Sequence, residues 1–201
     1  MDGRKLVSVS LILAPLILLL LADLLVGDYR LFTSINIELS NFILDFTCIY
    51  LTPTLFTTFY FLALAVLYTS KNEDDKFYGA ISLVNGSVSY GVGSAIKVLV
   101  ARPRPFQILD GVRIIGVWHT STYSFPSTTT MLVFGLTLPI LFRKSKYGFI
   151  LAALSYLVGF SVIYTGYHFP SDVIAGILLS APVAVFTIAI GRLVVDLIRK
   201  F

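Results

Sequence analysis

Six apolar runs dominate this 201-residue sequence and limit what it can fold into. A helix needs about 20 mostly apolar residues to cross a bilayer. The chain has 57% apolar and 13% charged residues, whereas a soluble domain carries about 25% charged residues. We therefore expect an all-α polytopic membrane protein, a bundle of six transmembrane helices that forms a single domain over residues 1–201. This composition excludes a nucleic-acid-binding module and an ordinary soluble enzyme. The predicted spans cover residues 6–26, 51–69, 77–100, 127–142, 147–164 and 173–195.

The basic residues indicate how these spans are oriented. Six spans place both termini on one side of the membrane, and ten of the 15 Lys and Arg residues fall on that side. The positive-inside rule therefore predicts an integral protein of the plasma membrane with both termini in the cytoplasm. Four of the other five basic residues lie in the outer segment 97–113, against this rule, which suggests that they have a function. The five are Arg30, Lys97, Arg102, Arg104 and Arg113.

Residues 29–46, between the first two spans, have a different pattern. Apolar side chains recur there every three or four residues, with polar and charged side chains between them. This pattern predicts an amphipathic helix that lies in the outer membrane interface. A partly buried cap on the helix bundle would have the same pattern.

Three cations follow one another where the third span ends. Lys97 lies near the end of the predicted helix, and Arg102 and Arg104 follow on a stretch stiffened by Pro103 and Pro105. Proline fixes its own φ and disfavours helix at the preceding residue. Two guanidinium groups and one ammonium group held in such a turn suit a phosphate. Anchoring among lipid headgroups is an equally good explanation for these residues taken alone.

Two further segments carry polar groups on the same predicted outer face. Pro126 and Ser127 precede the fourth span, and Ser127 is placed as an N-cap, where a helix offers unpaired N–H groups to an anion. His168 and Asp172 are four residues apart, with Pro170 able to begin the sixth helix. A carboxylate so placed can hold one ring nitrogen and make the other a better nucleophile or base. Taken singly, a simple helix cap and a structural His–Asp pair are the commoner explanations.

Together the three segments resemble the type 2 phosphatidic acid phosphatase superfamily. Its first motif is a lysine, six residues and Arg-Pro, which matches Lys97 through Arg104 and Pro105. Its second motif, Pro-Ser-Gly-His, is matched in its first half by Pro126 and Ser127. Its third motif, Ser-Arg, five residues, His, three residues and Asp, is matched by Ser161, His168 and Asp172.

The resemblance implies a helical bundle that holds a phosphate. Lys97, Arg104, Ser127 and the backbone beside Ser127, at Thr128 and Thr129, would bind it, and we add Arg102 to this clamp. His168 would attack phosphorus to form a phosphohistidine, and Asp172 would orient it. We expect neither cofactor nor metal, because cations and helix N–H groups supply the charge stabilisation.

The sequence departs from the family pattern at two positions. Thr129 stands where the family has the histidine that protonates the leaving group, and Val162 stands where it has a phosphate-binding arginine. A general acid typically contributes about 10²–10⁴-fold to the rate. His119, the only other histidine, could replace it, although an interfacial anchor beside Trp118 is the simpler interpretation.

These residues lead to one main hypothesis and two alternatives. We expect a lipid phosphatase on the outer membrane face, with the bilayer and a phosphorylated lipid as its partners; the sequence does not indicate an oligomeric state. Hydrolysis of a diphosphate expels a phosphate monoester whose second pKa is about 6. This leaving group needs a general acid less than the alkoxide that a phosphate monoester expels. The missing histidine therefore favours polyprenyl-type diphosphates. The alternatives are a degenerate member that binds or moves phosphorylated lipids, and a lipid phosphotransferase.

Overall fold

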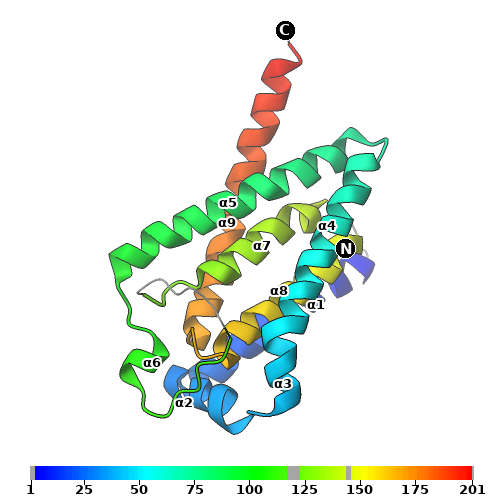
Figure 1. The fold of residues 1–201 in the computed structure, drawn as a ribbon. Helices are drawn as coiled ribbons and strands as arrows, with labels where there is room; N and C mark the ends of the chain where they lie inside the picture. The colour runs from blue at the N-terminus through cyan, green and yellow to red at the C-terminus, as the bar shows by residue number, and fades with distance from the viewer. Residues whose placement is uncertain (1–2, 117–122, 144–145, 201) are drawn as a thin grey trace.

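The computed structural model describes residues 3–116, 123–143 and 146–200, and the side chains among them from Leu13 onward. Within these ranges the regular structure is entirely helical (Figure 1). Two π-helical turns, Ser34–Glu38 and Thr47–Leu51, join the shorter helices. The helices are α1 (Gly3–Val26), α2 (Asp28–Thr33), α3 (Phe42–Phe46), α4 (Thr52–Thr69), α5 (Glu73–Val100), α6 (Pro105–Ile108), α7 (Thr128–Phe142), α8 (Lys146–Tyr164) and α9 (Pro170–Ile198).

Helix α7 lies at the centre of the bundle, in contact with α5, α8 and α9. Its sequence is apolar on all sides, and most of its side chains are buried, as expected for a helix surrounded by other helices. Small residues let α5 approach it closely. A Cβ atom added at Gly135 would lie 2.7 Å from the Oγ of Ser89 in α5, so only glycine fits there. The small residues of the third predicted span thus serve helix packing.

Among the residues that the structure describes, four helical segments are long and apolar enough to cross a membrane: Phe42–Thr69, Glu73–Ile108, Lys146–Tyr164 and Pro170–Ile198. They correspond to the second, third, fifth and sixth predicted spans, and each of the first two begins earlier than the hydropathy pattern indicated. The other two predicted spans are shorter apolar helices in the described part of the chain, Leu13–Val26 and Thr128–Phe142.

The segment 29–46 does not form the single amphipathic helix that its periodicity predicts. The chain is extended at Asn41, whose side-chain oxygen accepts a hydrogen bond from the N–H of Leu44 and so begins a new helix. That new helix continues into α4. In the first half, Phe32, Ile35 and Asn36 are buried, which is the arrangement of a cap on the bundle.

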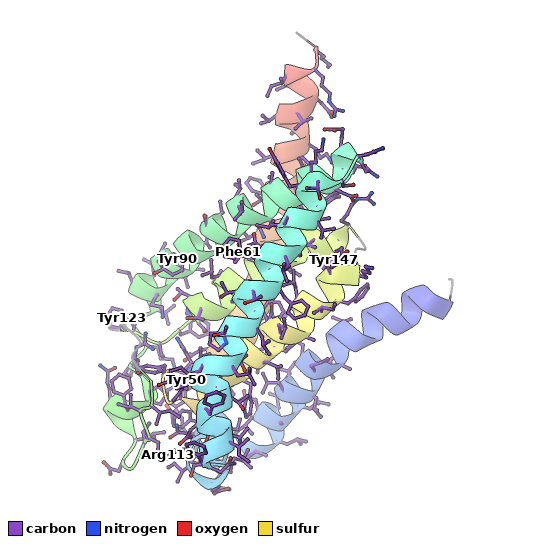
Figure 2. All side chains as sticks on the ribbon, turned by 45° about the vertical axis from the view of Figure 1, so that its right-hand side comes forward. Tyr50, Phe61, Tyr90, Arg113, Tyr123 and Tyr147 are labelled. Carbon is purple, nitrogen blue, oxygen red and sulfur yellow. The ribbon has the colours of Figure 1, made fainter. Side chains whose placement is uncertain are left out.

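The two ends of the bundle differ. Figure 1 shows α2, α3 and α6 gathered at one end, where α5 ends and α9 begins. The α4–α5 connection and the C-terminus lie at the opposite end. Figure 2 shows α1 diverging from the other helices toward its N-terminus, and it places Arg113 at the end that holds α2 and α3. The residues of the three sequence motifs all lie at this same end.

Candidate active site

The end of α5 is tied to the segment that precedes α7. Ala101 has a positive φ of 51°, which ends the helix, and the chain then runs non-helically to Arg104. The buried Lys97 ammonium group donates hydrogen bonds to the carbonyl oxygens of Tyr123 (3.0 Å) and Ser124 (3.3 Å). In return, the N–H of Ser124 donates to the carbonyl oxygen of Arg102 (2.8 Å). Lys97 is therefore held against the approach to the α7 N-terminus.

Arg104 is buried beside the turn that carries His168. Its Nη1 atom donates to the carbonyl oxygen of Tyr167 at 2.7 Å, and its backbone N–H donates to the Gln107 side chain at 2.7 Å. Only 3% of the residue is exposed. The guanidinium group therefore contacts the residue immediately before His168.

Ser127 is the N-cap of α7, as the sequence predicts. Its hydroxyl oxygen accepts hydrogen bonds from the N–H (3.3 Å) and the hydroxyl (2.9 Å) of Thr130. Its own N–H donates to the carbonyl oxygen of Asp172 at 3.0 Å, which joins the N-termini of α7 and α9. Thr128 and Thr129 occupy the first turn of α7, whose N–H groups have no acceptor within the helix.

His168 and Asp172 lie together in the turn that begins α9. His168 Nδ1 is 3.5 Å from Asp172 Oδ2, which is longer than an ordinary hydrogen bond, and Nδ1 has no hydrogen-bond partner among the described residues. Asp172 Oδ2 accepts the N–H of Phe169 at 2.9 Å, as the carboxylate of a helix cap does. The carboxylate is fully buried, so a small movement of the ring would complete the His–Asp hydrogen bond.

The surroundings of His168 favour a neutral imidazole. Burial lowers the pKa of His168 to about 4, and the positive charges of Lys97 and Arg104 act in the same direction, whereas Asp172 acts against them. A neutral imidazole keeps a lone pair on one ring nitrogen, and this is the form that a nucleophile requires.

Arg102 has carboxylate partners, which the sequence did not indicate. Its guanidinium group donates to Asp172 Oδ1 (2.7 Å) and to Asp28 Oδ2 (2.6 Å), and it lies 4.2 Å from the centre of the Phe169 ring. Asp28 also accepts hydrogen bonds from the N–H (3.0 Å) and the hydroxyl (2.6 Å) of Ser171. Burial would raise the pKa of Asp28, but the hydrogen bonds from Ser171 and Arg102 outweigh it and hold that pKa below its ordinary value.

Sequence reasoning missed Asp28 altogether. It is a single acidic residue at the start of α2, it belongs to none of the three motifs, and its partners Arg102 and Ser171 are more than 70 positions away in the chain. The one local signal is Gly27, whose positive φ of 90° turns the chain between α1 and α2. That turn does not indicate which residues the Asp28 carboxylate contacts.

The side chains of two other residues that the sequence singled out have different partners, and a third residue lies outside the description. Arg113 pairs with Asp45 at 2.9 Å. Val162 packs in the main apolar cluster, while its carbonyl oxygen accepts the N–H groups of Tyr167 and His168. His119 lies outside the described residues. Within the described ranges, no group of three His, Cys, Asp or Glu side chains is placed to hold a metal ion.

The chain is similar to curated proteins over most of its length. It is 33% identical over 166 residues to the bacitracin transport permease protein BcrC of Bacillus licheniformis, covering 77% of this chain and 80% of that one. It is 27% identical over 156 residues to the undecaprenyl-diphosphatase BcrC of Bacillus subtilis, covering 76% and 78%. A 113-residue match to the undecaprenyl-diphosphatase of Sulfolobus acidocaldarius is 28% identical and covers 56% and 54%.

Two solved structures share the fold. The LpxE protein of Aquifex aeolicus matches with a TM-score of 0.58 and 24% identity, covering 81% of this chain and 94% of that one. The transmembrane PAP2-type phosphatidylglycerolphosphate phosphatase of Bacillus subtilis matches with a TM-score of 0.59 and 21% identity, covering 92% and 96%. The long apolar helices of this chain make it an integral membrane protein. The model of the PAP2 superfamily matches residues 78–195, which include all three motifs, and the chain therefore belongs to the PAP2 superfamily.

Proposed function

We propose that this protein is a lipid phosphatase that hydrolyses a polyprenyl-type diphosphate. The observation that carries the proposal is the convergence of Lys97, Arg104, the α7 N-terminus and the His168–Asp172 pair at one end of the bundle. Two cations and a helix N-terminus suit a phosphate group, and a buried neutral histidine beside them suits attack on phosphorus. Two relatives are named undecaprenyl-diphosphatases, which supports a diphosphate as substrate.

The proposed reaction has two steps. Lys97, Arg104 and the first-turn N–H groups of α7 hold the terminal phosphoryl group, and the His168 ring nitrogen opposite Nδ1 attacks phosphorus. An N–P bond forms while the bond from phosphorus to the bridging oxygen breaks, and its electron pair leaves on the polyprenyl monophosphate. A water oxygen then attacks phosphorus, the N–P bond breaks, and inorganic phosphate leaves as the water proton passes to solvent. Asp172 stabilises the positive imidazole ring formed in between.

Because Thr129 cannot act as a general acid, the preferred substrate depends on whether its leaving group needs a proton. A phosphate monoester would expel an alkoxide, which needs a proton, and Thr129 stands where the family has the histidine that gives it. A diphosphate instead expels a phosphate monoester whose second pKa is about 6, so it leaves without an acid. A site with threonine at position 129 should therefore hydrolyse diphosphates faster than phosphatidate.

We further propose six membrane crossings, with α1 and α7 as the two shorter ones, both termini in the cytoplasm, and the site on the extracytoplasmic face of the plasma membrane. The uneven distribution of Lys and Arg supports this orientation. In a Cys48→Ser background, Asp110→Cys should react with an impermeant thiol reagent applied from outside, and Lys146→Cys should not. The reverse pattern would invert the topology.

The proposed activity is tested by phosphate release from purified protein in detergent. We expect release from a polyprenyl diphosphate, much slower release from phosphatidate, and loss of both in His168→Ala. Lys146→Ala, which changes a cation at the opposite end of the bundle, is the matched control and should keep its activity. Faster turnover of phosphatidate than of the diphosphate would contradict the leaving-group argument.

The replacements at Thr129 and Val162 favour one alternative, a member that binds or moves phosphorylated lipids without cleaving them. In that case no phosphate would be released, while a polyprenyl diphosphate would still bind and Lys97→Ala would weaken its binding. A phosphotransferase would be recognised by phosphate appearing on an added lipid alcohol and not in solution.

A further inference from the structure

We infer that Asp28 is a positioning residue for catalysis, which neutralises Arg102 so that the negative charge of Asp172 remains available to His168. This inference rests on the proposed phosphatase function and goes beyond it, because Asp28 lies outside all three motifs. It also changes the role expected for Arg102, from a phosphate ligand to the link between two carboxylates.

The contacts of Arg102 carry the first step. One guanidinium nitrogen, Nη1, is 2.7 Å from Asp172 Oδ1, and the other, Nη2, is 2.6 Å from Asp28 Oδ2. The Ser171 hydroxyl lies between them, accepting from Arg102 at 2.7 Å and donating to Asp28 at 2.6 Å. The Phe169 ring covers the guanidinium carbon at 4.2 Å. These contacts use three of the five N–H donors of the guanidinium group, so Arg102 is already paired with two carboxylates before any phosphate binds.

The second step concerns charge. Asp172 is fully buried, and the Arg102 and Asp28 side chains are each 21% exposed, so these charges interact with little screening by water. With Asp28 present, the three groups carry a net charge of −1. Without it they carry none, because Arg102 then cancels Asp172. Attack by His168 places positive charge on its ring, and a neighbouring group with a net negative charge stabilises that ring more than a neutral ion pair does.

The third step concerns position. Asp28 also accepts the N–H of Ser171 at 3.0 Å, in the first turn of α9, where a carboxylate complements the helix dipole. Asp172 is the next residue in that turn. Asp28 therefore ties the start of α2 to the backbone that carries Asp172, and it fixes both the location and the effective charge of the carboxylate next to His168.

The experiment compares Asp28→Asn with Asp45→Asn. Asp45 lies at the same end of the bundle and pairs with Arg113 at 2.9 Å, so its substitution removes a carboxylate from an ion pair with no link to Asp172. We expect Asp28→Asn to lower kcat on a polyprenyl diphosphate by about 10–100-fold, by analogy with the loss seen when a hydrogen-bond partner behind a metal-binding side chain is removed. KM should stay unchanged or fall, because the site becomes more positive toward an anion. Asp45→Asn should keep the wild-type kcat.

A double variant shows whether Asp28 acts through Arg102. If Asp28 acts through Arg102, adding Asp28→Asn to Arg102→Gln should change kcat by less than twofold. A further tenfold loss in the double variant would overturn the inference, as would a wild-type kcat in Asp28→Asn or a raised KM with unchanged kcat. If Asp28→Asn alone does not fold, the same comparison of Arg102→Gln with the double variant decides the question, because Arg102 is absent from both and Asp28 could then act only by another route.

The wild-type protein separates the two proposals. No phosphate release by wild type would overturn the proposed function, and with it this inference. Release by wild type with an unaffected Asp28→Asn variant would overturn the inference alone. Asp28→Glu, which keeps the charge, should recover most of the kcat that Asp28→Asn loses, and failure to recover any would also count against the charge argument.

Discussion

The imidazole of His168 should remain neutral at pH values where an ordinary histidine is charged. Its pKa is lowered from 6.5 to about 4, first by burial and then by the charges of Lys97 and Arg104. Each pKa unit corresponds to about 1.36 kcal/mol, so the site opposes protonation by roughly 3 kcal/mol. A phosphate bound between the two cations would offset their charge, and it should therefore raise the pKa of His168.

This shift also fixes the sign of a stability change. Between pH 6.5 and pH 4 the unfolded chain protonates His168 while the folded protein does not, so the unfolded state binds more protons. The free energy of unfolding therefore falls as the pH is lowered through this window, by up to roughly 3 kcal/mol from this group, and it is unaffected above it. Replacing His168 by Gln should flatten this part of the pH–stability curve.

The chain has only two histidines, which makes the measurement direct. In a His119→Gln background, the ¹⁵N shifts of a labelled histidine report His168 alone. We expect a midpoint well below pH 6 without ligand, a higher midpoint with inorganic phosphate, and a higher midpoint in Lys97→Met. Lys146→Met, at the far end of the bundle, should leave it unchanged. A ligand-free midpoint at 6.5 or above would refute the reasoning.

Three further predictions concern the rest of the site. Lys97→Ala should weaken binding of inorganic phosphate or vanadate at least tenfold in a filter or calorimetric assay, whereas Lys146→Ala should not, because only the first cation lies beside the α7 N-terminus. Thr129→His should raise turnover of phosphatidate by about 10²–10⁴-fold, the worth of a general acid, and that of a polyprenyl diphosphate by much less; equal gains would contradict this. Gly176→Ala should lower the free energy of unfolding by about 1–3 kcal/mol in a thermal-unfolding assay, because its Cβ would lie 3.0 Å from the carbonyl oxygen of Ser127. Gly91→Ala is the control and should leave it unchanged, because its Cβ would have no atom within 4 Å.

The sequence predicted those parts of the site that depend on local rules. Ala101 ends α5 just before the Arg-Pro-Arg-Pro stretch, and Ser127 caps α7, because proline and serine act on the backbone next to them. Pro170 begins α9 for the same reason. Hydropathy and the order of the spans then placed these helix ends together, since alternate connections of a helical bundle emerge on the same face.

The contacts that the sequence could not predict are those between side chains distant in the chain. Asp28 meets Arg102 and Ser171 only because α2 folds across the start of α9. Likewise, Asn36 bonds to the carbonyl oxygens of Arg113 and Tyr164 across 77 and 128 positions. A lone acid or amide in a short amphipathic segment carries no signal of its partner. The periodicity of that segment was also misleading, since the break at residue 41 depends on one side chain that begins a new helix.

The cations of segment 97–113 differ in their neighbours. Arg113 pairs with Asp45, and Arg102 pairs with Asp172 and Asp28. The ammonium group of the buried Lys97 instead donates to the carbonyl oxygens of Tyr123 and Ser124, which are neutral acceptors. A buried cation is costly without an opposing charge. Under the proposed function, a bound phosphate supplies that charge, and this would account for a lysine at this position.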